Sequence, residues 1–331
     1  MLSNNRAFHS QKLLAYAALF FLLHVLILSQ AKPCSAQESV ARETISKDRW
    51  LLVLSGLPGD EEHEVSLTTA ASQLAKFAPE VLRVPSKNVR ILLGDVKMQS
   101  KWPKEMIETT FGNPPVVCTA ESLASLISKL APMLGEDSEV FVFVLGHGYL
   151  QGRMAQWNVS GPDIDQNQFA DLLKGLPTKH KYLWLTHGCS GYWVKSLSAP
   201  GHVVMAATEA SEELTGTEMA FALGAVLEGN AEHSSLTDID EDGQISLLDL
   251  YLATCVEVHQ RFVTGDWLAT EHGQLDDNGD GRGSEIQEHY LPLDEKQPGS
   301  KEENLATQKR KRAIAKQFDG SLCSRIAIRV Q

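Results

Sequence analysis

Residues 139–148 read Glu-Val-Phe-Val-Phe-Val-Leu-Gly-His-Gly, an apolar run that stops at a histidine between two glycines. An unbroken apolar run is typical of a strand buried on both faces of a sheet. Similar runs occur at residues 49–55, 89–93, 182–185 and 203–207. Segments with helical spacing of apolar residues lie among them, at residues 62–82, 120–134, 169–176 and 218–227. This alternation predicts an α/β fold with a mainly parallel sheet and helices on both faces.

The composition is that of a globular protein. The chain has 331 residues, of which 43% are hydrophobic and 22% are charged. Its formal net charge is -12, whereas proteins that bind nucleic acid usually present a basic face. We therefore expect a globular protein, of one large α/β domain or two smaller ones, without a nucleic-acid partner.

The N-terminus has the features of a secretory signal peptide. Arg6 and Lys12 precede an apolar run at residues 13–28, and small residues follow, with cleavage expected near Ala31 or Ala36. The apolar run is short for a membrane span. We expect a secreted or periplasmic protein with no further membrane contact; an uncleaved leader would instead anchor it.

Two predicted strand ends carry residues suited to catalysis. His147 follows the strand at 139–145, and Cys189 follows the strand at 182–185 in a Gly-Cys-Ser-Gly turn. Ligands bind outside the carboxyl ends of parallel strands, so both residues are expected at one edge of the sheet. An imidazole activates a thiol as a nucleophile, and the backbone N–H of Gly148 is a candidate oxyanion donor. Either residue alone is more often structural; together they predict a Cys–His catalytic pair.

These strand ends resemble caspase-like cysteine peptidases. Residues 141–148 resemble the His-Gly strand end of that class, residues 182–191 its nucleophile strand, and residues 203–208 its next strand. The spacing of His147 and Cys189 is similar to that in legumain-type peptidases and their bacterial relatives. The resemblance implies a caspase-like fold, a Cys–His dyad, and endopeptidase activity on protein or peptide substrates.

Two other interpretations of the Gly-Cys-Ser-Gly turn stay open. If the turn is aligned on Ser190 and Gly191, the nucleophile position of the family falls on Gly188. The chain would then be an inactive pseudopeptidase or a calcium-binding module. The same turn, preceded by His187, lacks one glycine of a nucleophile elbow, which is typical of an α/β-hydrolase with a cysteine nucleophile. That fold needs a catalytic histidine after the nucleophile.

Residues 238–249 match the Ca²⁺-binding loop of an EF-hand. The predicted ligands are the side chains at the first, third, fifth and twelfth positions and the carbonyl group at the seventh: Asp238, Asp240, Asp242, Asp249 and Gln244. Asp249 is shorter than the usual glutamate. The alternative is a solvated Asp-Gly turn that caps the next helix. A second Asp-rich loop at residues 276–284 predicts either another cation site or part of the substrate cleft.

The sequence therefore predicts three segments. Residues 1–36 form the signal peptide, residues 48–293 form the caspase-like domain with both Asp-rich loops, and residues 294–331 form a charged C-terminal tail. The cysteines downstream of the leader are too few for a disulfide scaffold, and one structural pair is compatible with an oxidising compartment.

Overall fold

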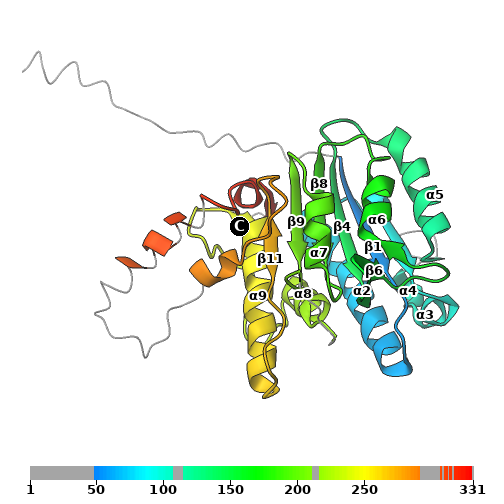
Figure 1. Cartoon of the computed structure of the whole chain (residues 1–331), viewed down its shortest axis with the longest axis horizontal. Coiled ribbons are helices and arrows are strands. Elements are labelled where there is room, and N and C mark those ends of the chain that lie inside the picture. Colours follow the sequence, from blue (N-terminus) through cyan, green and yellow to red (C-terminus); the bar gives the residue numbers. More distant parts are fainter. Residues whose placement is uncertain are drawn as a thin grey trace, which may run out of the picture. The chain divides into compact units, whose positions relative to one another are not determined.

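The computed structural model describes residues 48–106, 115–210, 216–290, 306–307, 309–311, 313–314 and 317–329. The predicted signal peptide lies outside these residues. Within them, a seven-stranded sheet is packed against helices (Figure 1). This is the α/β architecture with a mainly parallel sheet that the alternating pattern predicts.

The sheet is parallel except at one edge. Its strands lie in the order β11 (Gln274–Asp276), β9 (His202–Ala206), β8 (His180–Leu185), β4 (Glu139–Leu145), β1 (Arg49–Ser55), β2 (Val89–Leu93) and β3 (Val116–Val117). Only β11 runs antiparallel, against β9, among the strands of this sheet. Strands β4 and β8 are direct neighbours, with Val144 opposite Leu185 at the end of the ladder.

Alternate residues of each strand build two separate cores, which explains the unbroken apolar runs. On one face, Phe141 and Phe143 pack in a core with three helices: α2 (Glu61–Leu82), α8 (Met219–Glu228) and α9 (Leu247–Thr264). On the other face, Val142 and Val144 pack in a core with α5 (Ala120–Leu130), α6 (Gln166–Leu173) and α7 (Gly191–Leu197).

The remaining elements are short. Helices α3 (Val96–Lys101) and α4 (Lys104–Met106) follow β2, and one-turn 3₁₀ helices lie at Ser86–Asn88, Ala131–Met133, Ile286–His289 and Cys323–Arg325. Strands β5 (Gly148–Gln151), β6 (Met154–Trp157) and β7 (Ile164–Asp165) form a small antiparallel sheet directly after β4.

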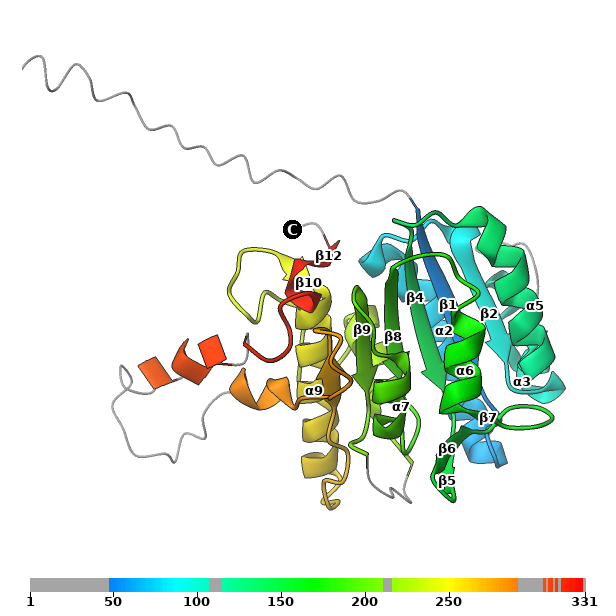
Figure 2. The same ribbon diagram turned by 45° about the horizontal axis from the view of Figure 1, so that its top comes forward.

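Part of the segment expected as a charged tail is built into the domain. Strand β12 (Ala327–Arg329) pairs antiparallel with β10 (Ile245–Ser246), as Figure 2 shows. Cys323 and Ile328 are fully buried in the core beneath α9 and α2. The guanidinium group of Arg49 donates to the carbonyl oxygen of Ala327 at 2.9 Å. The final segment is thus tied to the first strand of the sheet.

Two further properties concern the described part of the chain. Its helices are all too short or too polar to cross a membrane. The four cysteines in it are buried and form no disulfide bond, so the structural pair allowed by the sequence is absent there: Cys118, Cys189, Cys255 and Cys323.

Candidate functional site

The strand order reverses direction between β1 and β4. From β1 the chain proceeds outward through β2 to β3, and then returns to place β4 on the other side of β1. A crevice at such a switch point, outside the carboxyl ends of the strands, is where open α/β sheets bind ligands. Here the loop at residues 56–60 and the turn at residues 146–148 follow the carboxyl ends of these two strands.

His147 links these two segments. Its Nε2 lies 2.8 Å from the carbonyl oxygen of Pro58. A carbonyl oxygen only accepts, so Nε2 carries the proton and Nδ1 is the acceptor in the neutral ring. The Nε2 edge faces Gly59, because a Cβ there would lie 3.7 Å from both Nε2 and Cδ2. The ring is therefore held in the tautomer that lets Nδ1 take up a proton.

A second imidazole lies against the first. The ring of His63, in the first turn of α2, packs edge-on to His147 with centroids 4.9 Å apart. Its Nδ1 is 2.8 Å from both carboxylate oxygens of Asp60, which also caps α2 through the backbone N–H of His63. Asp60 has a lowered pKa because of these hydrogen bonds. Nδ1 of His63 is thus the protonated nitrogen, and Nε2 faces Gly216.

A cavity of about 210 Å³ adjoins the two rings. It lies at the carboxyl ends of β4 and β8, on the face covered by α2 and α8. Its walls comprise both imidazoles, Thr186 after β8, the segment leading into α8, and apolar side chains of the two helices: His63, His147, Thr186, Thr217, Glu218, Leu67, Ala220 and Phe221.

Cys189 lies elsewhere. Its side chain is 2% exposed and belongs to the core on the face of α6 and α7, together with Trp193 and Val194. It does not line the cavity beside His147. The residue has a positive φ of 59°, a strained backbone conformation for a residue other than glycine. The structure therefore brings the two strand ends together but places the His147 ring and the Cys189 side chain on different faces of the sheet.

Gly188 is the residue of this turn that lies nearest the His147 strand end. The ladder that ends with Val144 opposite Leu185 would, if continued by three residues, put position 188 beside His147. The carbonyl oxygen of Gly188 touches Gly148, where a Cβ atom would overlap with it. A Cβ at Gly148 would also lie 2.7 Å from Nδ1 of His187. Only glycine fits at the predicted oxyanion position.

His187 points into the interior. The side chain is fully buried, and its ring packs against Trp193 with centroids 4.7 Å apart. Nδ1 donates to the carbonyl oxygen of Gly188 at 2.9 Å, and Nε2 has no hydrogen-bond partner among the described residues. Burial lowers the pKa of His187 to about 4. The ring is neutral at physiological pH and fills space under the turn.

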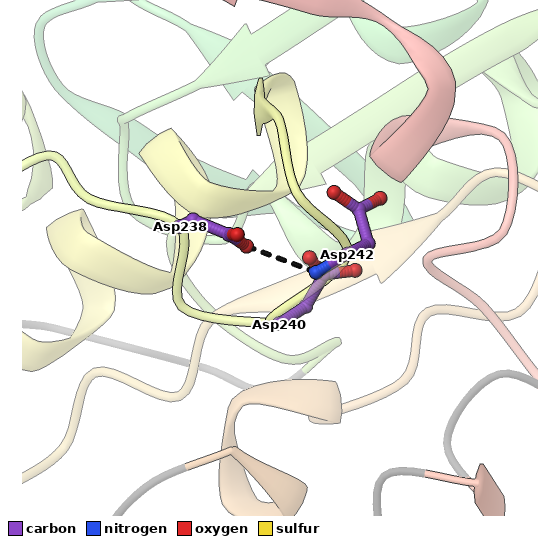
Figure 3. A group of neighbouring side chains, drawn as sticks. All are labelled: Asp238, Asp240 and Asp242. Atoms are coloured by element: carbon purple, nitrogen blue, oxygen red, sulfur yellow. Dashed lines mark hydrogen bonds between the residues drawn. The ribbon is translucent and has the colours of Figure 1, made fainter. Parts of the chain in front are cut away.

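The EF-hand-like loop brings three of its predicted ligands together. Carboxylate oxygens of Asp238, Asp240 and Asp242 lie within 4.8 Å of one another (Figure 3). That separation fits oxygen atoms about 2.4 Å from one Ca²⁺ ion. Asp238 accepts from the backbone N–H groups of Asp242 and Gly243, so it already bridges the loop.

The carboxylate of Asp249 and the side chain of Gln244 both form hydrogen bonds within the protein. Both carboxylate oxygens of Asp249 accept backbone N–H groups, from Ile239 on one side and Ser246 on the other. The buried carboxylate therefore closes the loop through its hydrogen bonds. The side chain of Gln244 donates to the carbonyl oxygen of Ser324 at 2.7 Å, which leaves its backbone carbonyl as the relevant group.

The second Asp-rich loop holds the C-terminal segment. Asp277 accepts from the backbone N–H groups of Gly320, Leu322 and Cys323 at 2.7–2.9 Å. The carboxylate of Asp319 in turn accepts from the backbone N–H of Asp277 at 3.1 Å. Burial raises the pKa of Asp319 to about 6. In the part of the chain that the structure describes, this loop therefore fixes the C-terminal segment to the domain through hydrogen bonds.

The site residues that sequence reasoning missed are His63, Thr186 and Glu218. Asp60 preceding a helical pattern is a helix N-cap signal and could have indicated where α2 begins. It could not have indicated that the first turn of that helix meets His147.

Comparison with known proteins identifies no relationship. No known protein family matches the sequence, and no curated protein is significantly similar to it.

Proposed function

We propose that this chain is a caspase-like protein that binds a peptide at the switch point of the sheet, beside the cavity next to His147, without cleaving it. Two features support the class. The strand ending in His-Gly is the neighbour of the strand ending in Gly-Cys-Ser-Gly, as the resemblance requires. An oriented imidazole and an adjoining cavity also lie at the carboxyl end of β4.

One observation carries the non-catalytic part of the proposal. The Cys189 side chain is buried in the core opposite to the face on which His147 and Thr186 line the cavity. Aligning the turn on Ser190 and Gly191 puts Gly188 at the nucleophile position. The hydroxyl of Ser190 accepts from the backbone N–H groups of Ala207 and Thr208, which fixes the turn against β9.

Thiol reactivity and cleavage test the proposal. The purified full-length protein is incubated with iodoacetamide and, separately, with a mixed fluorogenic peptide library. We expect Cys189 in the folded protein to stay unalkylated over the time in which the unfolded chain reacts. We also expect no peptide to be cleaved, although library peptides bind saturably. Cleavage that disappears in Cys189→Ala would overturn it.

A secreted cysteine endopeptidase is the second candidate, and the His147–Pro58 contact favours it. A general base is normally oriented by a third group, and here a backbone carbonyl holds the ring with Nδ1 as acceptor. In this mechanism Cys189 would attack the peptide carbonyl after transferring its proton to His147, and the Gly148 N–H would bind the oxyanion. Cleavage abolished by both Cys189→Ala and His147→Ala would establish it.

The hydrolase interpretation has less support. A nucleophile elbow needs a histidine at the same sheet edge, after the nucleophile. His202, the first histidine after Cys189, begins β9 at the opposite end of the strands, and its Nδ1 bonds the carbonyl oxygen of Leu197. We do not adopt this function.

We further propose that Asp238, Asp240, Asp242 and the Gln244 carbonyl bind Ca²⁺, with Asp249 as a structural support. The convergence of three carboxylates supports this. Calorimetric titration with CaCl₂ is expected to show one site that is lost in Asp240→Asn. No heat of binding, or binding unchanged in Asp240→Asn, would contradict it.

The leader-like N-terminus supports export as part of the proposal. N-terminal sequencing of the protein made with its own leader is expected to begin after Ala31 or Ala36. An intact N-terminus in the membrane fraction would favour the anchored alternative.

A further inference from the structure

We propose that the cavity beside His147 receives a cationic side chain, that of arginine or lysine. The inference deepens the proposed function, and it rests on that function only in assuming that the side chain belongs to a peptide.

The hydrogen-bonding groups of the cavity are acceptors. The Nε2–H of His147 donates to the carbonyl oxygen of Pro58 and the Nδ1–H of His63 donates to Asp60, so the other nitrogen of each ring is an acceptor in the neutral imidazole. The hydroxyl group of Thr217 donates to the carbonyl oxygen of Thr186, so the hydroxyl oxygen of Thr217 can act only as an acceptor toward a ligand. A ligand that satisfies such walls must supply N–H donors.

The charges around the cavity favour a cation. Glu218 lines it and is 24% exposed, and one of its oxygens pairs with Arg261 at 3.2 Å. Arg261 is itself shared with Glu257, which is 2% exposed. Asp60 is hydrogen-bonded to the ring of His63. Glu271 accepts the backbone N–H groups at the start of α8. These described groups comprise four carboxylates and one guanidinium, so their summed formal charge is negative.

The size of the cavity fits one long side chain. At about 210 Å³ it is smaller than a site for a whole small molecule, which is typically 300 Å³ or more. Leu67, Ala220 and Phe221 give it an apolar wall. A (CH₂)₃ or (CH₂)₄ stem can lie along such a wall while its charged end reaches the acceptors.

Binding of matched amino-acid amides tests the inference. We would titrate the full-length protein with N-acetyl-arginine amide, its neutral isostere N-acetyl-citrulline amide, and N-acetyl-glutamate amide, following the ring signals of His63 and His147 by NMR. The arginine amide is expected to bind about tenfold more tightly than the citrulline amide, the usual effect of a charge-assisted hydrogen bond. Equal affinities, or a preference for glutamate, would overturn the inference.

Variants locate the effect. Glu218→Gln is expected to weaken binding of the arginine amide about tenfold, and His63→Phe, which keeps a ring against His147, about fivefold. Glu232→Gln makes the same charge change outside the cavity and should leave the affinity within about twofold. Unchanged affinity in both Glu218→Gln and His63→Phe would also overturn it.

The two proposals fail differently. If the arginine amide binds as expected but library peptides do not, the peptide-binding function fails and the cavity assignment stands. If peptides bind without preference for a basic residue and the amides show none, only the cavity assignment fails.

Discussion

Gly188 and Cys189 are consecutive residues of the turn that follows β8. A shift of one residue in the alignment exchanges a thiol for a glycine at the nucleophile position. The choice between a peptidase and a binding protein therefore depends on a single position of the turn.

Gly188→Cys should place a thiol on the His147 side. In the double variant Gly188→Cys/Cys189→Ala we expect alkylation by iodoacetamide in the native state at least about tenfold faster than at Cys189 in the wild-type chain, because the imidazole promotes thiolate formation. Mass spectrometry of the alkylated peptide measures both rates. A double variant as inert as the wild-type chain would mean that position 188 does not face His147.

His187 should make the protein less stable in acid. Its pKa is about 4 in the folded protein and 6.5 in the unfolded chain. Between these pH values the unfolded chain binds a proton that the folded protein does not, so the free energy of unfolding falls as the pH is lowered from 6.5 to 4. The loss is expected to reach roughly 3 kcal/mol.

The variant His187→Phe isolates this effect. Urea denaturation of both proteins at several pH values gives the difference between them, in which the opposing titration of Asp319 cancels. A difference that does not change between pH 7 and pH 4 would show that His187 is protonated in the folded state.

At the scale of the element, Asp249 links the EF-hand-like loop to α9. It forms a capping box with Ser246 at the start of the helix and also accepts the N–H groups that open the loop. One carboxylate thus organises both the loop and the helix, which explains why an aspartate suits the twelfth position here.

Asp249→Asn should therefore destabilise the protein without calcium. Its amide group would place N–H donors against backbone N–H groups, at an expected cost of about 2 kcal/mol in the free energy of unfolding measured by urea denaturation in EDTA. Asp242→Asn is the matched control, because Asp242 is exposed, and should change that free energy by less than about 0.5 kcal/mol. Equal effects of the two substitutions would argue against the structural role.

At the scale of the whole molecule, the C-terminal segment completes the core. Ile328 is fully buried where β12 meets α2, whereas Phe318 in the same segment is 58% exposed. Ile328→Ala should lower the free energy of unfolding by about 3 kcal/mol, and Phe318→Ala by less than about 1 kcal/mol. Thermal or urea denaturation measures both. Equal, small effects would mean that the segment is not docked in solution.

The sequence by itself determined the alternation of strands and helices. It also indicated the two strand ends that carry His147 and Cys189. The runs at 49–55, 89–93 and 139–145 coincide with β1, β2 and β4, because strands buried on both faces must be apolar throughout. It did not reveal β12 or the small sheet after β4, whose two- to four-residue strands are too short for any period to show.

Tertiary structure alone decided which groups meet. The sequence brought His147 and Cys189 to neighbouring strand ends, but the face that each side chain takes depends on the backbone of the turn, including the positive φ of Cys189. His63 reaches His147 from a helix far along the chain, and the last strand returns to the first. Such contacts arise from packing between distant elements, which local patterns do not encode.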